Sequence, residues 1–274
     1  MLGACFVIQP TENFVISDLV LAFRRPGMWM YSAWITFLLK YRKTFIGPLW
    51  IIAGPAMFII ILGTLFGNVM GHDARDFVPH LAVGLVFWGY LNSIATSAPR
   101  IYLQFRASLL QGHVNHMNLV MRTIFSSFVV FIHQAVIIIA VLLIYRITPT
   151  ASWLYFIPAA ALTLLHSIWV IVVLGILGAR YRDLAEVVEM VMRIAFLATP
   201  IIWKVGEEQG RGSIVGVYLV LNPFYHVIEP MRGAILGTPI AAQSWIISFM
   251  IALVGLALAE VLYRKYRHLV VLWT

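Results

Sequence analysis

Long apolar stretches without a charged side chain recur along the chain and are separated by short polar connections. The hydrocarbon core of a bilayer is about 30 Å thick, so a helix that advances about 1.5 Å per residue needs about 20 residues to cross it. Five of the stretches reach this length. They predict transmembrane helices over residues 47–66, 77–99, 123–145, 153–178 and 244–263.

A sixth apolar stretch covers residues 185–203 and is less regular. It contains Glu186, Glu189 and Arg193, which share one face of a helix because of their spacing. Glu189 precedes Arg193 by four residues, the favourable order for an ion pair. Charge at this depth indicates either a functional site or an ion pair that orients the helix against protein, and we favour the ion pair. We count this stretch as the fifth of six spans.

Six spans place both chain ends on the same side of the membrane, and the basic residues indicate which side this is. The opposite side carries five basic and five acidic residues. Because Lys and Arg collect on the cytoplasmic side, we expect both termini in the cytoplasm. The basic residues that support this orientation are Arg24, Arg25, Lys40, Arg42, Lys43, Arg100, Arg106, Arg122, Arg180, Arg182, Arg264, Lys265 and Arg267.

Two cytoplasmic segments are predicted not to cross. Residues 18–43 carry aromatic side chains on one face and basic side chains near their ends, as in a helix that lies in the membrane interface. Pro26-Gly27 divides this segment. Residues 100–118 form a connection with a short helical piece over residues 101–110.

One external segment, residues 204–240, is also predicted not to cross. Its apolar part, residues 213–221, is too short to span a bilayer. Asn222-Pro223 and Glu229-Pro230 are expected to interrupt helical structure. Non-helical backbone at membrane depth must be covered by protein, so we expect re-entrant short helices here.

The composition excludes an ordinary soluble domain. Of the 274 residues, 62% are apolar or aromatic and 11% are charged, with a mean hydropathy of +0.92. Soluble domains average about 25% charged residues and rarely expose large apolar patches. The sequence therefore predicts an all-α integral membrane protein with a single transmembrane domain over residues 1–274.

The net charge of +8 is explained by membrane topology, so we expect no nucleic-acid partner. Cys5 is the only cysteine, which excludes an intramolecular disulfide. The sequence has no P-loop, no Gly-rich dinucleotide-binding turn and no HExxH motif. His113 and His116 have no cysteine or acid near them in sequence, so we favour two water-exposed loop histidines over a metal site. We expect no catalytic residue, metal or cofactor in this chain.

Three motifs occur in order between residues 40 and 232. The first, KYRKTFIGPLW over residues 40–50, is followed by Gly54-Pro55. The second is RYRDL over residues 180–184 with Glu186, followed by TPIIW over 199–203. The third is LNPF over residues 221–224 with Glu229 and Arg232. Together they resemble the type 2 ABC exporter permeases (ABC-2) for polysaccharides. One departure is His116-Met117-Asn118, where that family often has a Phe-Pro turn.

The resemblance implies the membrane subunit of an exporter for capsular polysaccharide or lipid-linked O-antigen in the bacterial inner membrane. It implies a homodimer with two separate ATPase subunits, which would bind the ATP and Mg²⁺. Membrane lipids and periplasmic or outer-membrane export components are further expected partners. The alternatives are an ABC-2 permease for drugs or small lipids and, less favoured, a membrane-embedded enzyme of glycan or lipid metabolism.

The resemblance also suggests roles for individual residues. The loop over residues 100–118 and the turn at 180–183 would contact the ATPase, and Glu189 and Arg193 would form the intramembrane ion pair. Aromatic side chains could stack on sugar rings in the conduit, and basic ones could bind a phosphate head group, although lipid binding explains these equally well. The ATPase-coupling candidates are Arg100, Arg106, His113, Asn115, Arg180, Arg182 and Asp183. The head-group candidates are Lys40, Arg42 and Lys43, and the conduit candidates are Trp50, Phe58, Phe87, Trp88 and Tyr90. The external re-entrant candidates are Asn222, Pro223, Glu229 and Arg232.

Overall fold

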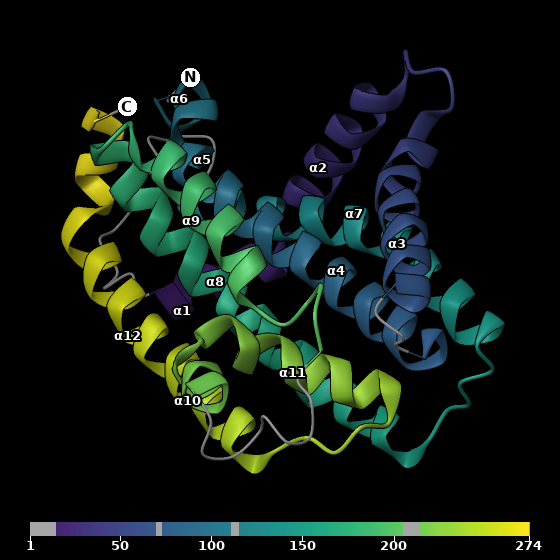
Figure 1. Ribbon diagram of the computed structural model, residues 1–274. Helices are drawn as coiled ribbons and strands as arrows, with labels where there is room; N and C mark the ends of the chain where they lie inside the picture. The colour runs from purple at the N-terminus through teal and green to yellow at the C-terminus, as the bar shows by residue number, and fades with distance from the viewer. Residues whose placement is uncertain (1–14, 70–72, 111–114, 205–213, 274) are drawn as a thin grey trace, which may run out of the picture.

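The computed structural model describes residues 15–69, 73–110, 115–204 and 214–273, and every regular element in these ranges is a helix (Figure 1). This confirms the predicted all-α class. The longer helices are α1 (Val15–Arg24), α2 (Pro26–Tyr41), α3 (Trp50–Val69), α4 (Ala74–Ser97), α7 (His116–Ile144), α8 (Phe156–Arg180), α9 (Leu184–Ala198), α10 (Ile214–Leu221), α11 (Pro223–Leu236) and α12 (Ala242–Trp273). Short pieces are η1 (Gly47–Leu49), η2 (Ala98–Arg100), α5 (Ile101–Gln104), α6 (Arg106–Leu110) and η3 (Ala151–Tyr155).

Five helical stretches in the described ranges are long and apolar enough to cross a membrane, namely Gly47–Leu65, Ala74–Gln104, His116–Ile144, Ala151–Arg180 and Ala242–Trp273. The sixth predicted span corresponds to α9, which ends at Ala198 rather than at residue 203. Thr199 is extended (φ −93°, ψ 140°) because the following Pro200 disfavours the helical conformation there. The 15 residues of α9 extend only about 22 Å.

Two helices extend beyond their predicted bounds by more than three residues. Helix α7 begins at His116 instead of residue 123, because the Asn115 side chain accepts a hydrogen bond from the Met117 backbone N–H and caps the helix. Residues 116–118 therefore belong to this helix and not to the preceding loop. Helix α12 continues ten residues past the predicted end at 263, because Tyr263 and Val270 are buried against the rest of the bundle.

The interface segment divides at Pro26 into α1 and α2, where the sequence has its Pro-Gly pair. The sequence pattern suggested that its aromatic residues all face the membrane interface, but only some of them do. Trp29 and Phe37 are buried, with Trp29 against Phe125 and Phe37 against His133 on α7, whereas Trp34 is exposed.

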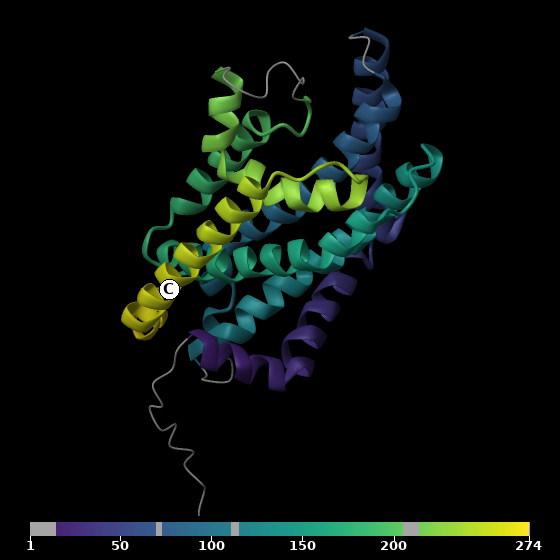
Figure 2. The same cartoon turned by 90° about the horizontal axis from the view of Figure 1, so that it is seen from below.

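The first and last described helices are joined near the end of the bundle that also holds α6, the lower end in Figure 2. The Val15 backbone N–H donates to Glu260 Oε2 at 2.8 Å, and the Tyr263 hydroxyl donates to Asp18 Oδ2 at 2.7 Å. At the opposite end, α11 lies across the bundle and contacts α4, α8 and α12 (Figure 2). Pro230 was expected to break the chain, but it lies inside α11.

Gly178 permits a close approach between α8 and the η2 piece that follows α4. A Cβ at this position of α8 would overlap the backbone of Pro99 in η2, which cannot move aside as a flexible side chain could. We expect Gly178→Ala to destabilise the protein by about 1–3 kcal/mol, the usual cost of overpacking. Thermal unfolding of the purified protein measures this loss. Gly54→Ala is the matched control, because a Cβ on Gly54 meets nothing within 4 Å; equal losses in the two variants would contradict the prediction.

Candidate functional site

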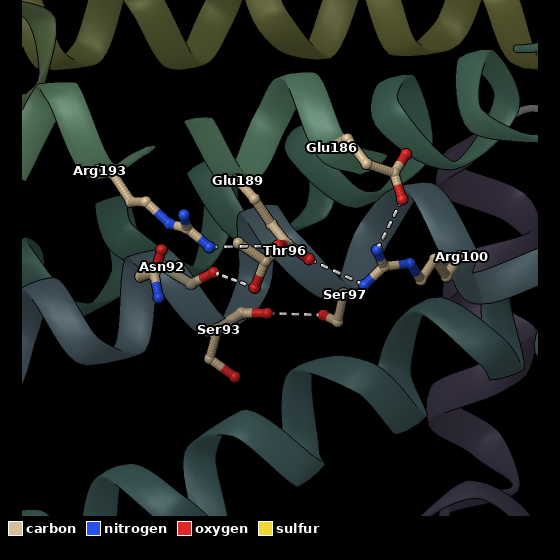
Figure 3. A network of polar contacts seen from close by, with 8 residues as sticks. All are labelled: Asn92, Ser93, Thr96, Ser97, Arg100, Glu186, Glu189 and Arg193. Carbon is tan, nitrogen blue, oxygen red and sulfur yellow. Dashed lines mark hydrogen bonds and ion pairs between the residues drawn. The ribbon is translucent and has the colours of Figure 1, made fainter. Parts of the chain in front are cut away.

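A cluster of four charged side chains joins the end of α4 to α9 (Figure 3). Arg100 donates to Glu189 Oε1 at 2.9 Å and to Glu186 Oε1 at 3.2 Å. Arg193 lies 3.7 Å from the other oxygen of Glu189. The Glu189–Arg193 pair suggested by the sequence is thus present, but Arg100, which is 89 residues from Glu189 in the sequence, binds the Glu189 carboxylate more closely. The two positive and two negative charges balance.

Helix ends help to place this cluster. Arg100 follows the last turn of α4, where the helix dipole favours a positive charge, and Glu186 lies in the first turn of α9, where it favours a negative one. One turn before Arg100, Thr96 and Ser97 donate to the carbonyls of Asn92 and Ser93 on their own helix (Figure 3). The hydroxyl donors of Thr96 and Ser97 are therefore satisfied within their own helix.

Arg193 lies past the middle of α9, and its side chain is 82% exposed. The apolar side chains of Met190, Ile194 and Leu197, on the same side of the helix by spacing, are exposed as well. An arginine at membrane depth is costly unless it faces water or a polar partner. Glu189 at 3.7 Å is one such partner, and at membrane depth the outward side of the guanidinium would need water or a second one.

The other end of α9 is held by the two short helices that follow it. The Tyr218 hydroxyl on α10 and the Asn222 side-chain amide both donate to the Ala198 carbonyl, at 2.7 and 3.2 Å. The Asn222 side-chain oxygen also accepts from the backbone N–H groups of Phe224 and Tyr225, so this residue caps α11, with Pro223 at the favoured first position. One side chain thus connects the end of α9 to the start of α11.

Arg232 on α11 completes this attachment. Its Nη2 donates to the Pro200 carbonyl at 2.8 Å, and its Nη1 lies 3.3 Å from Glu229 Oε2. His80 on α4 contacts the same carbonyl at 3.2 Å and the Trp203 carbonyl at 3.3 Å, so Nε2 must carry the proton. Burial lowers the pKa of Arg232, and the Glu229 carboxylate opposes that shift. We call Tyr218, Asn222, Arg232 and His80 the α9 cap.

The predicted ATPase-coupling residues come from the segments around η2, α6 and the turn between α8 and α9, and their surroundings differ. Arg106, Arg180, Arg182 and Asp183 are exposed, and the Arg180 guanidinium lies 5.3 Å from the centre of the Trp273 ring. Arg100 is in the charged cluster, and Asn115 is the cap of α7. His113 falls outside the described residues. The predicted head-group residues Lys40, Arg42 and Lys43 are exposed at and just beyond the end of α2.

The predicted conduit aromatics separate into two groups. Trp50 and Phe58 on α3 are exposed, and Phe58 lies 6.3 Å from Phe196 on α9. Phe87, Trp88 and Tyr90 are buried within the chain, and Phe87 and Tyr90 line an internal cavity rather than an exposed face. Their rings pack against other side chains, and the Tyr90 hydroxyl bonds Ser167.

Sequence reasoning missed His80 and Tyr218 in the α9 cap. A histidine within an otherwise apolar span, as at position 80, is the signal that could have identified one of them. Tyr218 gave no comparable signal, because a tyrosine in a short external helix is typical of the membrane interface.

Comparison with known proteins places these networks in a wider context. The family profile described as ABC-2 type transporter matches residues 29–236. The chain is 25% identical over 244 residues to an O-antigen export system permease protein RfbA of Klebsiella pneumoniae, covering 83% of this chain and 88% of the relative. A protein of the same name from Myxococcus xanthus is 22% identical over 184 residues, covering 67% of this chain and 70% of the relative. The match spans both ends of α9.

Proposed function

The chain belongs to the ABC-2 type transporter family, and from this we propose that it is the membrane-spanning permease subunit of an ATP-driven polysaccharide exporter. The names of its relatives, O-antigen export permeases, support a glycan as the cargo. We further propose that this glycan is lipid-linked or capsular and crosses the bacterial inner membrane from the cytoplasmic side. Both termini would lie in the cytoplasm, as the distribution of basic residues indicates.

The observation that carries this proposal is the uncovered face of α9 with Arg193. A second copy of the chain, or water enclosed between two copies, would remove the cost of exposing this side chain to lipid. We therefore propose a homodimer in which two α9 helices border a hydrated path. The polar groups of α4, including Asn92 and Thr96, and the exposed aromatic rings of Trp50 and Phe58 would line the same path.

ATP hydrolysis is assigned to two copies of a separate subunit, which would bind ATP and Mg²⁺. The exposed Arg106, Arg182 and Asp183 are suited to contact it. The turn at 180–183 leads directly into α9, so a push there would act on the charged cluster and then along the helix. Lys40, Arg42 and Lys43 are suited to a phosphate-bearing head group arriving at the cytoplasmic interface.

The proposal is tested by purifying the full chain with its ATPase partner and reconstituting both in nanodiscs. We expect the two proteins to copurify in equal numbers, and we expect a glycolipid that carries the glycan to stimulate ATP hydrolysis. Stimulation by drugs but not by the glycolipid would support the drug or small-lipid permease instead. Transport by this chain alone would contradict the proposal.

Replacing Arg193 tests the path directly. We expect Arg193→Leu to preserve assembly and to reduce the initial rate of glycan export several-fold, because an apolar side chain replaces a charge in the hydrated path. Arg193→Lys is the matched control and should retain most of the rate, since it keeps the charge. An Arg193→Leu variant that exports at the normal rate would show that this side chain is not on the path.

A further inference from the structure

A polar cavity of about 520 Å³ lies at the predicted external end of the bundle, next to the α9 cap. Its walls come from α4, from α11 and from the residues that follow α7 and α9. Sites for small molecules typically enclose about 300–1,000 Å³. The cavity is thus of suitable size for a small molecule.

Arg232 gives the cavity a buried donor that is not fully used. Its side chain is 4% exposed, and Nη1 and Nη2 are engaged by Glu229 and Pro200. Its Nε is buried and has no hydrogen-bond partner among the described residues. Its Nε has no surface open to the cavity, so the donors left for a bound molecule are the second N–H bonds of Nη1 and Nη2.

The charged side chains of the cavity wall have both signs, so a strongly charged ligand of either sign meets like charges there. Glu229 and Asp76 would repel a phosphate, and Arg232 and Arg75 would repel a cation. Lys204 and Asp76, both of which line the cavity, form an ion pair with 3.7 Å between Nζ and Oδ2. A neutral molecule, or one with a single negative charge, fits this mixture if it offers many donors and acceptors.

The remaining wall combines hydroxyl and apolar groups. Burial is the main cause, and the Glu229 charge the second, of a rise in the pKa of Tyr225 to about 12. Its hydroxyl therefore stays protonated and can both donate and accept a hydrogen bond. Pro79, Ile147 and Leu236 add apolar surface. By contrast, the cavity of about 470 Å³ between α4, α7 and α8 is lined almost wholly by apolar and aromatic side chains, as suits a lipid tail.

We propose that this cavity binds one sugar ring of the exported glycan where it leaves the path, with Arg232, Glu229 and Tyr225 bonding its hydroxyls and the apolar wall covering its C–H faces. This inference rests on the proposed function, because the ligand is taken from the exported cargo. The site would hold the chain at the exit between successive strokes of the ATPase.

Photo-crosslinking of the reconstituted complex during ATP turnover tests the site with the glycan that the producing cells make. A diazirine amino acid is placed at Ile147 in the cavity wall, at Asn92 on the proposed path, or at Ile157, which is exposed on α8 and does not line the cavity. Sugar released by acid hydrolysis from the washed permease measures each adduct. We expect adducts at 147 and 92 and background at 157.

Tyr225 variants then test the contact itself. We expect Tyr225→Phe to lower the adduct at 147 by about fivefold, the loss of one net hydrogen bond, and to leave the adduct at 92 unchanged. An unchanged adduct at 92 also shows that the variant is folded. Adducts at 92 but not at 147, or equal adducts at 147 and 157, would overturn the sugar site while leaving the proposed function intact. Adducts at none of the positions would overturn both.

Discussion

Arg232→Gln is expected to abolish export and to lower the free energy of unfolding by roughly 3–5 kcal/mol, the cost of removing one partner of a buried ion pair. Glu229, whose side chain is 17% exposed, would be left as a largely covered charge without its counter-ion, and the Pro200 carbonyl would lose its closest donor. The α9 cap would then hold the end of α9 through His80, Tyr218 and Asn222 alone. Thermal unfolding in nanodiscs and the export rate measure the two effects.

The double variant Glu229→Gln/Arg232→Gln separates the two contributions to this loss. Neutralising both partners removes the uncompensated charge, so we expect stability to recover substantially while export stays low, because the Pro200 contact is still weakened. Arg75→Gln, at the exposed rim of the neighbouring cavity, is the matched control and should unfold like the parent protein. If Arg232→Gln were as stable as Arg75→Gln, the ion pair would not hold the cap.

Arg100→Glu is expected to reduce glycan-stimulated ATP hydrolysis and export by about 5- to 150-fold, the range of typical coupling energies between distant sites. The new carboxylate would repel Glu186 and Glu189 and so separate the end of α4 from the start of α9. The ATPase stroke would then no longer reach the path. The measurement compares ATP turnover with and without glycolipid, because uncoupling leaves the basal rate in place.

The double variant Arg100→Glu/Glu189→Arg restores opposite charges across the same contact and should recover part of the coupling. Lys265→Glu is the control for charge reversal on the same side, since its side chain is exposed on α12. No recovery in the double variant, or an equal loss in Lys265→Glu, would argue against a specific role for the pair.

Local features were predictable from the sequence because they depend on neighbouring residues. The Pro26-Gly27 pair marks the division of the interface helix, and Asn222-Pro223 marks the start of α11 through capping. Contacts between distant segments were not predictable. The i,i+4 spacing identified Glu189 and Arg193 but could not indicate Arg100, which reaches the same acid from another helix.

The orientation of side chains around apolar helices was also beyond the sequence. In a span that is apolar on every face, periodicity does not distinguish a lipid-facing or path-lining position from a buried one. Phe87, Trp88 and Tyr90 were therefore interpreted as path residues, although they pack inside the bundle, whereas Trp50 and Phe58 are exposed. The early end of α9 depends on Pro200 together with tertiary partners from α10 and α11.

The bonds between α1 and α12 have a consequence for biosynthesis. Val15 bonds Glu260, and Asp18 bonds Tyr263, in each case across 245 positions of the chain. A ribosome releases the partners of α1 only when translation is almost complete, and contacts this distant form late because they close the longest loops. The hydrogen bonds of α1 must wait for α12, so a truncated chain that stops before α12 would hold α1 only through its packing against earlier helices such as α7.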